Sequence, residues 1–232
     1  MSGRLAGRRV LVTHAERYGG PPVVELFRAE GAEVIADTSE YSDPKAPQAI
    51  VEAAGHVDVL VANFAGPLRI MPFTQMLGPV QEFRDEDFQA YLDELVWPMT
   101  RFVRAVLPQM IDRRAGKIVG VTSASTLRAI PGLAVYTAAR GAQNAFVQVV
   151  GAEVAPHNVQ FNAIAPAFFE NNTYFTPEML ADEAIRAQLV ANIPAGRIGE
   201  GREGAELALA LATDASGFLA GQVIAFSGGW AT

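Results

Sequence analysis

Short apolar stretches rich in valine alternate along this chain with longer segments whose apolar residues recur at helical spacing. Strands buried on both faces of a parallel sheet read as continuous apolar runs, whereas amphipathic helices repeat every three to four residues. The predicted strands occupy residues 8–13, 32–36, 57–61, 116–121, 158–164 and 222–226. The predicted helices occupy residues 23–30, 48–54, 85–107, 136–154, 178–192 and 203–212. This alternation predicts an α/β protein, a doubly wound parallel sheet with helices on both faces.

The order of these elements predicts one domain over residues 1–232. No repeat, low-complexity tract or linker divides the sequence, and its length is ordinary for a single α/β domain. Pro98 falls inside the helix predicted at 85–107 and is expected to kink it, because proline removes a backbone donor. An irregular segment is expected from Ala165 to Pro177.

Composition narrows the class of protein. Half of the residues are hydrophobic and 19% are charged, which is typical of a globular chain. No apolar run approaches the roughly 20 residues that span a bilayer, and residues 1–9 lack the apolar core of a signal peptide. The sequence has no cysteine, so disulfides and thiolate metal sites are excluded. We therefore expect a cytoplasmic protein with no membrane partner.

Charge and histidine spacing argue against two further classes. The formal net charge of −7, with no basic stripe, disfavours nucleic acid as a partner because phosphate backbones would be repelled. His14, His56 and His157 lie far apart, and none has a partner at helical spacing, so no metal site is expected.

Three residues with potential acid–base chemistry follow the strand predicted at 116–121. Ser123 comes shortly after that strand, Tyr136 lies thirteen residues later, and Arg140 follows one helical turn beyond. Positions i and i+4 share a helix face, so the guanidinium of Arg140 is expected beside the phenol of Tyr136.

This set, with the order of the elements around it, resembles the short-chain dehydrogenase/reductase superfamily. The resemblance extends over essentially the whole chain and includes residues 58–63 on the third strand and the Gly228-Gly229 pair near the end. It implies a Rossmann-like fold. In reductases of this class, a Thr-Gly-x-x-x-Gly-x-Gly loop after the first strand lets the backbone approach a pyrophosphate at a helix N-terminus.

The aligned loop departs from that pattern at two of its three glycine positions. Residues 13–20 read Thr-His-Ala-Glu-Arg-Tyr-Gly-Gly, so His14 and Tyr18 stand where glycines would be. Their rings would occupy the space of phosphate oxygens, and Glu16 adds a negative charge nearby. Asp37, at the position of an NAD-binding carboxylate, is then expected to be inherited or solvated. We therefore expect no dinucleotide and no other cofactor.

The second departure lies on the helix, where reductases carry Tyr-x-x-x-Lys and this chain reads Tyr136-Thr-Ala-Ala-Arg140. The sequence holds only two lysines, Lys45 and Lys117, so no other alignment supplies one. A Ser-Tyr-Arg set combined with a blocked glycine loop resembles the halohydrin dehalogenases. This resemblance implies cofactor-independent interconversion of vicinal halohydrins and epoxides.

In the implied reaction, the Tyr136 phenolate removes the proton of the substrate hydroxyl, and the resulting alkoxide expels the neighbouring halide. Arg140 stays protonated at any accessible pH and would stabilise that phenolate. Ser123 would donate a hydrogen bond to the substrate oxygen, and Ser125, eleven residues from Tyr136, is the weaker candidate. In the reverse direction, neutral Tyr136 would protonate an epoxide while azide, cyanide or nitrite opens the ring.

The same resemblance implies a halide pocket built from the loop after the strand at 158–164 and from the aromatic residue in the glycine loop. The corresponding residues are Tyr18, Pro166, Ala167, Phe168 and Phe169. Backbone N–H groups of a tight loop bind anions, and aromatic edges carry partial positive charge. Family members carry an amide side chain beside the proline, so Ala167 leaves this contribution to the backbone.

The substrate pocket itself is expected to include Phe64, Tyr174 and Phe175, with loops around 66–82 and 167–177 shaping it. Some family members place an acid near the Phe64 position that orients the arginine, so the sequence leaves open what holds Arg140. A homotetramer is implied by resemblance, because the two long helices pack against a symmetry mate in this superfamily. Two other functions stay open: an NAD(P)-dependent short-chain dehydrogenase/reductase with an atypical glycine loop, and a catalytically inactive ligand-binding member.

Overall fold

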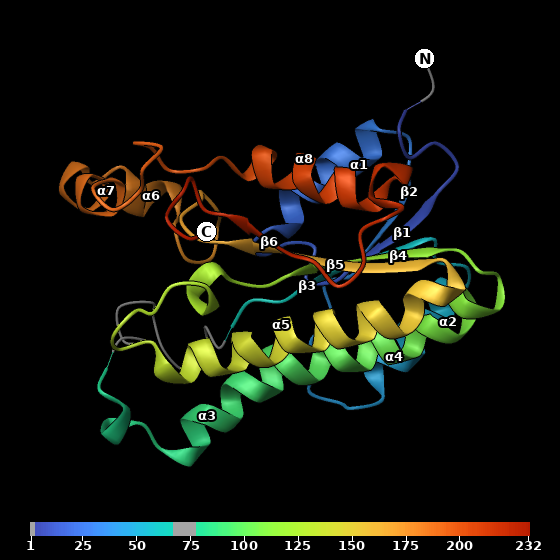
Figure 1. Cartoon of the computed structure of the whole chain (residues 1–232), viewed down its shortest axis with the longest axis horizontal. Coiled ribbons are helices and arrows are strands. Elements are labelled where there is room, and N and C mark those ends of the chain that lie inside the picture. Colours follow the sequence, from blue (N-terminus) through green and yellow to red (C-terminus); the bar gives the residue numbers. More distant parts are fainter. Residues whose placement is uncertain (1–2, 67–77) are drawn as a thin grey trace.

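The computed structural model describes residues 3–66 and 78–232 and contains a six-stranded parallel sheet (Figure 1). Along the sheet the strands follow the order β2-β1-β3-β4-β5-β6. The strands are β1 (Arg9–Val12), β2 (Glu33–Ala36), β3 (Val59–Asn63), β4 (Gly116–Val121), β5 (Val159–Pro166) and β6 (Val223–Phe226). Strands β3 and β5 are buried along their full lengths, because helices cover both faces of the sheet. The prediction of a doubly wound, Rossmann-like α/β fold is confirmed.

Figure 1 shows two helical layers on opposite faces of the sheet. One layer holds α1 (Gly20–Ala29) and α8 (Gly201–Ala212), and the other holds α2 (Ala46–Ala54), α4 (Trp97–Asp112) and α5 (Ala134–Val154). The shorter helices α3 (Asp85–Tyr91), α6 (Pro177–Leu180) and α7 (Glu183–Val190) lie toward one end of the molecule.

The helix predicted at 85–107 is divided in the structure. After α3 comes the π-helical turn η3 (Leu92–Val96), and α4 then continues through Pro108 to Asp112. Pro98 lies in the first turn of α4, where its missing N–H and preset φ are tolerated. The helix is thus interrupted next to Pro98, as the sequence predicts: the π turn Leu92–Val96 spans the backbone with which the proline ring conflicts.

The helix predicted at 178–192 is also two helices. The Asp182 carboxylate accepts hydrogen bonds from the N–H groups of Ala184 and Ile185 at 2.9 and 3.1 Å. An aspartate cap of this kind gives α7 its own start, separate from α6. The segment expected to be irregular from Ala165 begins later, because β5 continues through Pro166.

The topology brings three distant loops to one end of the sheet. In doubly wound sheets, ligands bind outside the carboxyl ends of the strands. The loops that follow β1, β4 and β5 carry Tyr18, Ser123 and Ala167. Because the strands are parallel, these residues all lie at the carboxyl ends of the strands.

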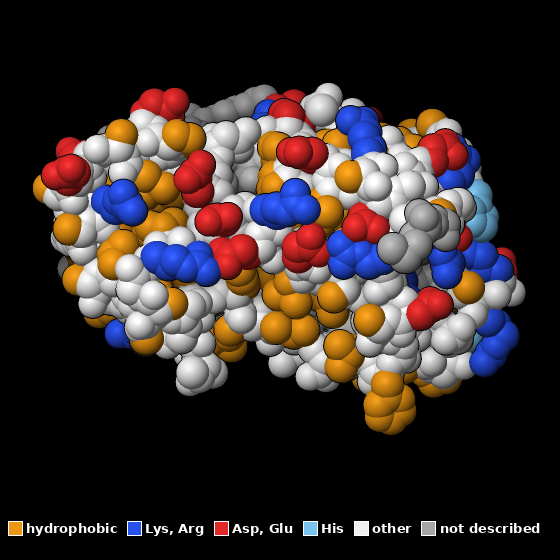
Figure 2. Space-filling model, turned by 90° about the horizontal axis from the view of Figure 1, so that it is seen from above, with side chains coloured by type: hydrophobic (Ala, Val, Ile, Leu, Met, Phe, Trp, Pro, Cys, Tyr) orange, Lys and Arg blue, Asp and Glu red, His pale blue; other side chains and the backbone are white. Residues whose placement is uncertain are grey.

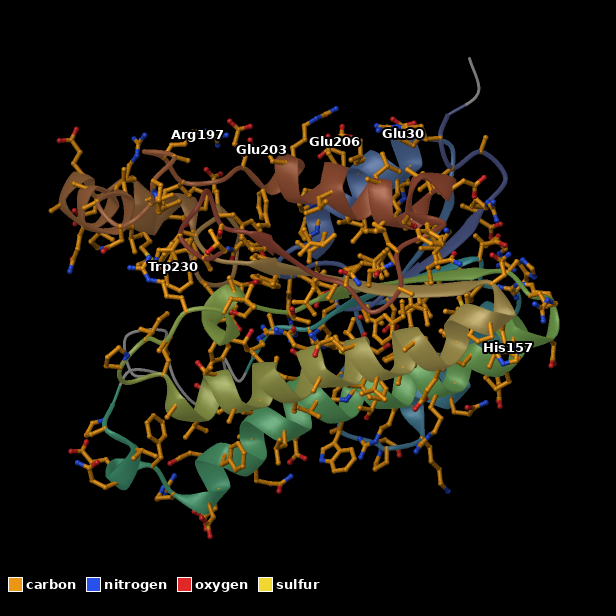
Figure 3. The ribbon with its side chains drawn as sticks, viewed as in Figure 1. Glu30, His157, Arg197, Glu203, Glu206 and Trp230 are labelled. Atoms are coloured by element: carbon orange, nitrogen blue, oxygen red, sulfur yellow. The ribbon has the colours of Figure 1, made fainter. Side chains whose placement is uncertain are left out.

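Charges of both signs are interspersed over the face formed by α1 and α8 (Figure 2). Arg4 pairs with Glu30 and Glu206. Arg197 pairs with Glu203 (Figure 3). Exposed pairs of this kind add little stability, but they leave no single-sign field on this face. Within residues 3–66 and 78–232, no helix meets the length and apolarity needed to cross a membrane, and no group of three potential metal ligands occurs.

Two glycines of α5 test how closely this helix packs on the sheet. A Cβ at Gly151 would overlap the backbone of Gly221, whereas a Cβ at Gly141 would meet nothing within 4 Å. We expect Gly151→Ala to lower the free energy of unfolding by about 1–3 kcal/mol through overpacking. Gly141→Ala should raise it by about 0.5–1 kcal/mol through helix propensity. Urea unfolding measures both, and equal effects of the two substitutions would contradict the packing.

Candidate active site

Arg140 is the largest of the fully buried side chains, and it lies beside Tyr136 on α5. Its Nε donates a hydrogen bond to the Tyr136 hydroxyl at 3.1 Å, and its Cζ lies 5.2 Å from the centre of that ring. The i, i+4 spacing produces this contact, as the sequence indicates. A permanently protonated guanidinium that donates to a phenol oxygen stabilises negative charge on that oxygen.

Uncharged acceptors hold the guanidinium of Arg140. Its Nη2 donates to the Phe64 carbonyl at 3.2 Å, and its Nη1 donates to the Val121 carbonyl at 3.4 Å and to Gln143 Oε1 at 2.9 Å. No acidic side chain among the described residues pairs with Arg140. Two backbone carbonyls and one amide therefore orient the arginine, and its positive charge is not neutralised.

Ser123 and Ser125 form one hydroxyl pair at the end of β4. Ser123 caps the short 3₁₀ helix η4 (Ala124–Thr126), and its Oγ accepts from the Ser125 N–H at 3.2 Å. The same Oγ donates to Ser125 Oγ at 3.1 Å. Both side chains are buried and line the same cavity as Tyr136. Both hydroxyls therefore lie at the cavity, joined by a hydrogen bond.

A cavity of about 60 Å³ lies against these hydroxyl groups. Its described lining is Tyr18, Ser123, Ser125, Ile130, Leu133, Tyr136, Pro166, Ala167, Phe168, Tyr174, Phe175 and Trp230. Apart from the serine and tyrosine hydroxyls and the indole N–H of Trp230, these side chains are apolar. A small apolar cavity with a few convergent polar groups is typical of a site for a small organic molecule.

Three of the residues predicted for the site do not line this cavity. Arg140 is fully buried behind the cavity wall, where it contacts Tyr136 and lies near the Tyr18 ring. The Phe64 ring packs near Phe102 in the core, and its backbone carbonyl is what contacts Arg140. The Phe169 ring packs against Phe226, with centroids 6.0 Å apart, and lies outside the lining. The Phe64 ring is therefore not part of the described lining. Phe169 remains a predicted halide contact through its backbone N–H, and its ring lies 5.2 Å from that of Tyr18, which does line the cavity.

Trp230 lines the cavity, although the sequence drew attention only to the two glycines before it. Gly228 and Gly229 have φ of 59° and 84°, a left-handed conformation that favours glycine. The resulting turn brings Trp230 edge-on to Phe168, with centroids 5.4 Å apart. Arg128 fixes it, because its Nη1 donates to the Trp230 carbonyl at 2.9 Å and its Cζ lies 5.0 Å from the ring. Figure 3 shows Trp230 where the end of the sheet near α6 faces the loop before α5.

Tyr174 lies in the segment 167–177 that was expected to shape the pocket; most of the other expected segment, residues 67–77, lies outside the described residues. The Tyr174 hydroxyl accepts from the Gly66 N–H at 2.9 Å and lies 3.3 Å from the Gly66 carbonyl. Burial raises the pKa of Tyr174 and of Tyr18, and negative charge at Tyr136 raises both further. These two phenols therefore remain neutral, and Tyr136 is the phenol that Arg140 contacts directly.

Side chains occupy two positions of the β1 loop whose backbone conformation favours glycine. His14 and Tyr18 have φ of 42° and 53°, in the left-handed region. The Tyr18 N–H donates to Asn172 Oδ1 at 3.0 Å and to Thr173 Oγ1 at 2.8 Å. This loop amide is bound to the protein, whereas a phosphate-binding loop directs its amides at the ligand.

The imidazole of His14 stacks on Tyr41, with ring centroids 4.6 Å apart and 18° between the planes. The Tyr41 hydroxyl donates to Asp37 Oδ2 at 2.5 Å and accepts from the His14 N–H at 3.1 Å. Ser39 Oγ also donates to Asp37, at 2.7 Å. The Asp37 carboxylate, expected to be inherited or solvated, thus binds protein groups where a ribose would need it. These residues do not fit a dinucleotide.

The backbone after β5 differs from the expected halide loop in one respect. The Ala167 N–H donates to the Phe226 carbonyl at 3.0 Å, so it is not available to an anion. The N–H groups of Phe168 and Phe169 donate to no described residue. Phe168 lines the cavity, and the Tyr18 ring does so as well. The amides of Phe168 and Phe169 and the edge of the Tyr18 ring are therefore the described groups left to contact a halide.

The chain matches the family described as enoyl-(acyl carrier protein) reductase over residues 6–231. A gluconate 5-dehydrogenase from Gluconobacter oxydans is 31% identical over 97% of this chain and 95% of its own length. A 3-oxoacyl-(acyl-carrier-protein) reductase from Thermotoga maritima is also 31% identical, over 97% of this chain and 98% of its own. A solved structure named "Dehalogenation enzyme" is 33% identical, with a TM-score of 0.89 and coverage of 98% of this chain and 99% of that one.

Burial of His14 predicts a pH dependence of stability. Burial, reinforced by the charge of Arg17, lowers the pKa of His14 to about 4, from about 6.5 in an unfolded chain. The unfolded state therefore binds a proton first, and stability that is present above pH 6.5 is lost as the pH falls toward 4, by about 3 kcal/mol in all.

His14→Asn keeps a residue that accepts positive φ and removes the titrating group. We expect urea unfolding between pH 7 and pH 5 to show a smaller loss of stability in this variant than in the wild type. The same loss in both proteins would show that His14 does not contribute to it.

Proposed function

Because this chain belongs to the short-chain dehydrogenase/reductase family and carries His14 and Tyr18 in its β1 loop, we propose that it is a halohydrin dehalogenase. The enzyme would interconvert vicinal halohydrins and epoxides without a nicotinamide cofactor. The observation that carries the proposal is the buried guanidinium of Arg140, which donates to the Tyr136 hydroxyl beside a β1 loop filled by aromatic rings. Similarity to a structure named "Dehalogenation enzyme" supports it.

In the forward reaction, the Tyr136 phenolate takes the proton of the substrate hydroxyl. The alkoxide oxygen attacks the neighbouring carbon, the carbon–halogen bond breaks, and its electron pair leaves with the halide. The products are an epoxide, a halide ion and a proton, which Tyr136 passes to solvent before the next turnover. Arg140 stabilises the phenolate between turnovers, because its charge has no acidic partner among the described residues.

Ser123 holds the substrate oxygen. Its hydroxyl donates to Ser125 in the structure without substrate, and a rotation of the O–H bond would redirect it to the substrate. The Ser125 N–H, which donates to Ser123 Oγ, keeps that oxygen in place. In the reverse reaction, neutral Tyr136 protonates the epoxide oxygen while halide, azide, cyanide or nitrite opens the ring.

We place the leaving halide between Tyr18 and the loop after β5. The Phe168 N–H has no described acceptor, Tyr18 presents a neutral ring, and Arg140 lies 5.9 Å from the centre of that ring. A positive group behind an apolar wall attracts an anion more strongly than it would in water. Pro166 shapes this wall, whereas the Ala167 amide is occupied by β6.

An NAD(P)-dependent reductase is the second candidate, favoured by the names of the two 31% identical relatives. Against it stand the arginine at position 140 and the contacts that occupy Asp37 and the Tyr18 amide.

We keep a cytoplasmic homotetramer as part of the proposal. Trp97 on α4 and Val149 on α5 are exposed apolar residues on the helices that would meet.

Halide release from 1,3-dichloro-2-propanol tests the activity. We expect wild type to release chloride and Tyr136→Phe to be slower by about 10²–10⁴-fold, because the general base is removed. Tyr91→Phe is the matched control: the Tyr91 ring lies 5.9 Å from the Tyr136 ring, and its buried hydroxyl has no hydrogen-bond partner among the described residues. Its loss should therefore change the rate little. No release from a panel of vicinal chloro- and bromo-alcohols would exclude a dehalogenase.

Titration with NADH and NADPH separates the two candidates. Fluorescence or calorimetry should detect no binding at cofactor concentrations that saturate ordinary reductases, because the loop amide and carboxylate already have protein partners. Tight binding of either cofactor would favour the reductase.

A further inference from the structure

Gln143 is a polar side chain buried between α5 and the π-helical turn η3. It lies one helical turn after Arg140 on α5 and is only 1% exposed. Its Oε1 accepts from Arg140 Nη1 at 2.9 Å, and its Nε2 donates to the Leu95 carbonyl at 2.7 Å. A buried amide is costly unless both ends are satisfied, and here each end has a partner of a different kind.

The acceptor at the far end, the Leu95 carbonyl, belongs to the π-helical turn η3. Such turns interrupt the regular i→i+4 pattern and often occur at functional sites. In this chain the π turn ends just before α4, and Pro98 lies in the first turn of α4. Gln143 is therefore anchored to the irregular turn that precedes Pro98.

Together these contacts form a chain from η3 to the candidate base: the Leu95 carbonyl, the Gln143 amide, the Arg140 guanidinium and the Tyr136 hydroxyl. Fixing Nη1 by Gln143, and Nη2 by the Phe64 carbonyl at 3.2 Å, directs Nε at Tyr136. A planar guanidinium held at two nitrogens cannot turn its third away.

The neutral charge of Gln143 matters as much as its geometry. A carboxylate at this place would orient the guanidinium equally well, but it would offset the positive charge that stabilises a phenolate. The remaining acceptors of Arg140, the carbonyls of Phe64 and Val121, are neutral too. All described groups that bind this arginine therefore position it without neutralising it.

We propose that Gln143 is a positioning residue that holds the Arg140 guanidinium against Tyr136 while leaving its charge unopposed. This inference rests on the proposed function, in which Tyr136 is the base. Gln143 itself does not line the cavity, so it acts through Arg140 and not on the substrate.

Other titratable groups also face Tyr136 and Arg140, and a pH measurement must account for them. They are Tyr18 from the β1 loop, Tyr91 from α3 and Tyr174 from the segment after β5. Burial raises the pKa of all three, that of Tyr91 to about 12. A signal that disappears with Tyr136→Phe can therefore be separated from theirs.

Two substitutions separate geometry from charge. Gln143→Met has similar size and removes both hydrogen bonds, so kcat should fall about 10–100-fold with KM changed less than about threefold. Gln143→Glu keeps an acceptor for Arg140 but adds a negative charge, so the acidic limb of the pH–rate profile should move about one unit or more to higher pH. Gln148→Met, at an exposed position of the same helix, is the matched control and should behave as wild type.

Spectroscopic titration gives a readout that does not depend on turnover. The ultraviolet absorbance of phenolate is recorded against pH for each protein with and without Tyr136→Phe, and the difference reports on Tyr136. We expect this difference signal to move to higher pH in both Gln143 variants and to stay in place in Gln148→Met.

The outcomes distinguish the two proposals. Unchanged rates, pH profile and difference signal in folded Gln143→Met and Gln143→Glu would overturn the role of Gln143. Absence of halide release by wild type would overturn the proposed function, while the titration would still decide whether Gln143 controls Tyr136 through Arg140. If Gln143→Met fails to fold, as thermal unfolding would reveal, Gln143→Glu alone decides: an unmoved signal in that variant overturns the inference.

Discussion

The burial of one positive charge without an acidic partner is the constraint on which the rest of this site depends. A guanidinium removed from water is strongly destabilising unless its N–H groups are satisfied. Arg140 meets that requirement with the carbonyls of Phe64 and Val121, the amide of Gln143 and the hydroxyl of Tyr136. Each of these groups comes from an element that the sheet positions, so the ends of β3 and β4 and the first half of α5 have to fit around this side chain. The field of the unneutralised charge is then directed at the phenol oxygen.

The loop after β1 shows how the space that a dinucleotide would occupy in this family is filled. His14 and Tyr18 retain positive φ, a backbone shape suited to glycine, yet they fill the loop with rings. His14 packs on Tyr41, which in turn binds Asp37, and Tyr18 lies near the guanidinium. A scaffold that otherwise provides a phosphate site thus becomes an aromatic wall.

The fold and part of the site could be predicted from the sequence, because the patterns that indicate them involve residues close together in the chain. Valine-rich runs separated by amphipathic segments predict a doubly wound sheet, because a strand that is buried on both faces has no alternating polar residues. The i, i+4 spacing of Tyr136 and Arg140 predicts their contact, because helix geometry alone decides it. The loss of glycine at positions 14 and 18 indicates a blocked loop for the same reason: backbone conformation restricts which residues leave room for a ligand. Most residues expected around the cavity do line it.

What the sequence could not decide are contacts between residues far apart in the chain. Neither Trp230, brought to the cavity by a glycine turn and Arg128, nor Gln143, joined to Leu95 across a π turn, has a local signal. Phe64 contacts the site through its carbonyl while its ring packs in the core, because an aromatic residue near a site can face the core as readily as the cavity, and only packing selects between the two. Short-range periodicity and spacing thus determined the fold, the Tyr136–Arg140 pair and the filled loop. Tertiary structure alone decided what holds the buried charge and what closes the cavity, because both depend on side-chain directions set by elements that meet only after folding.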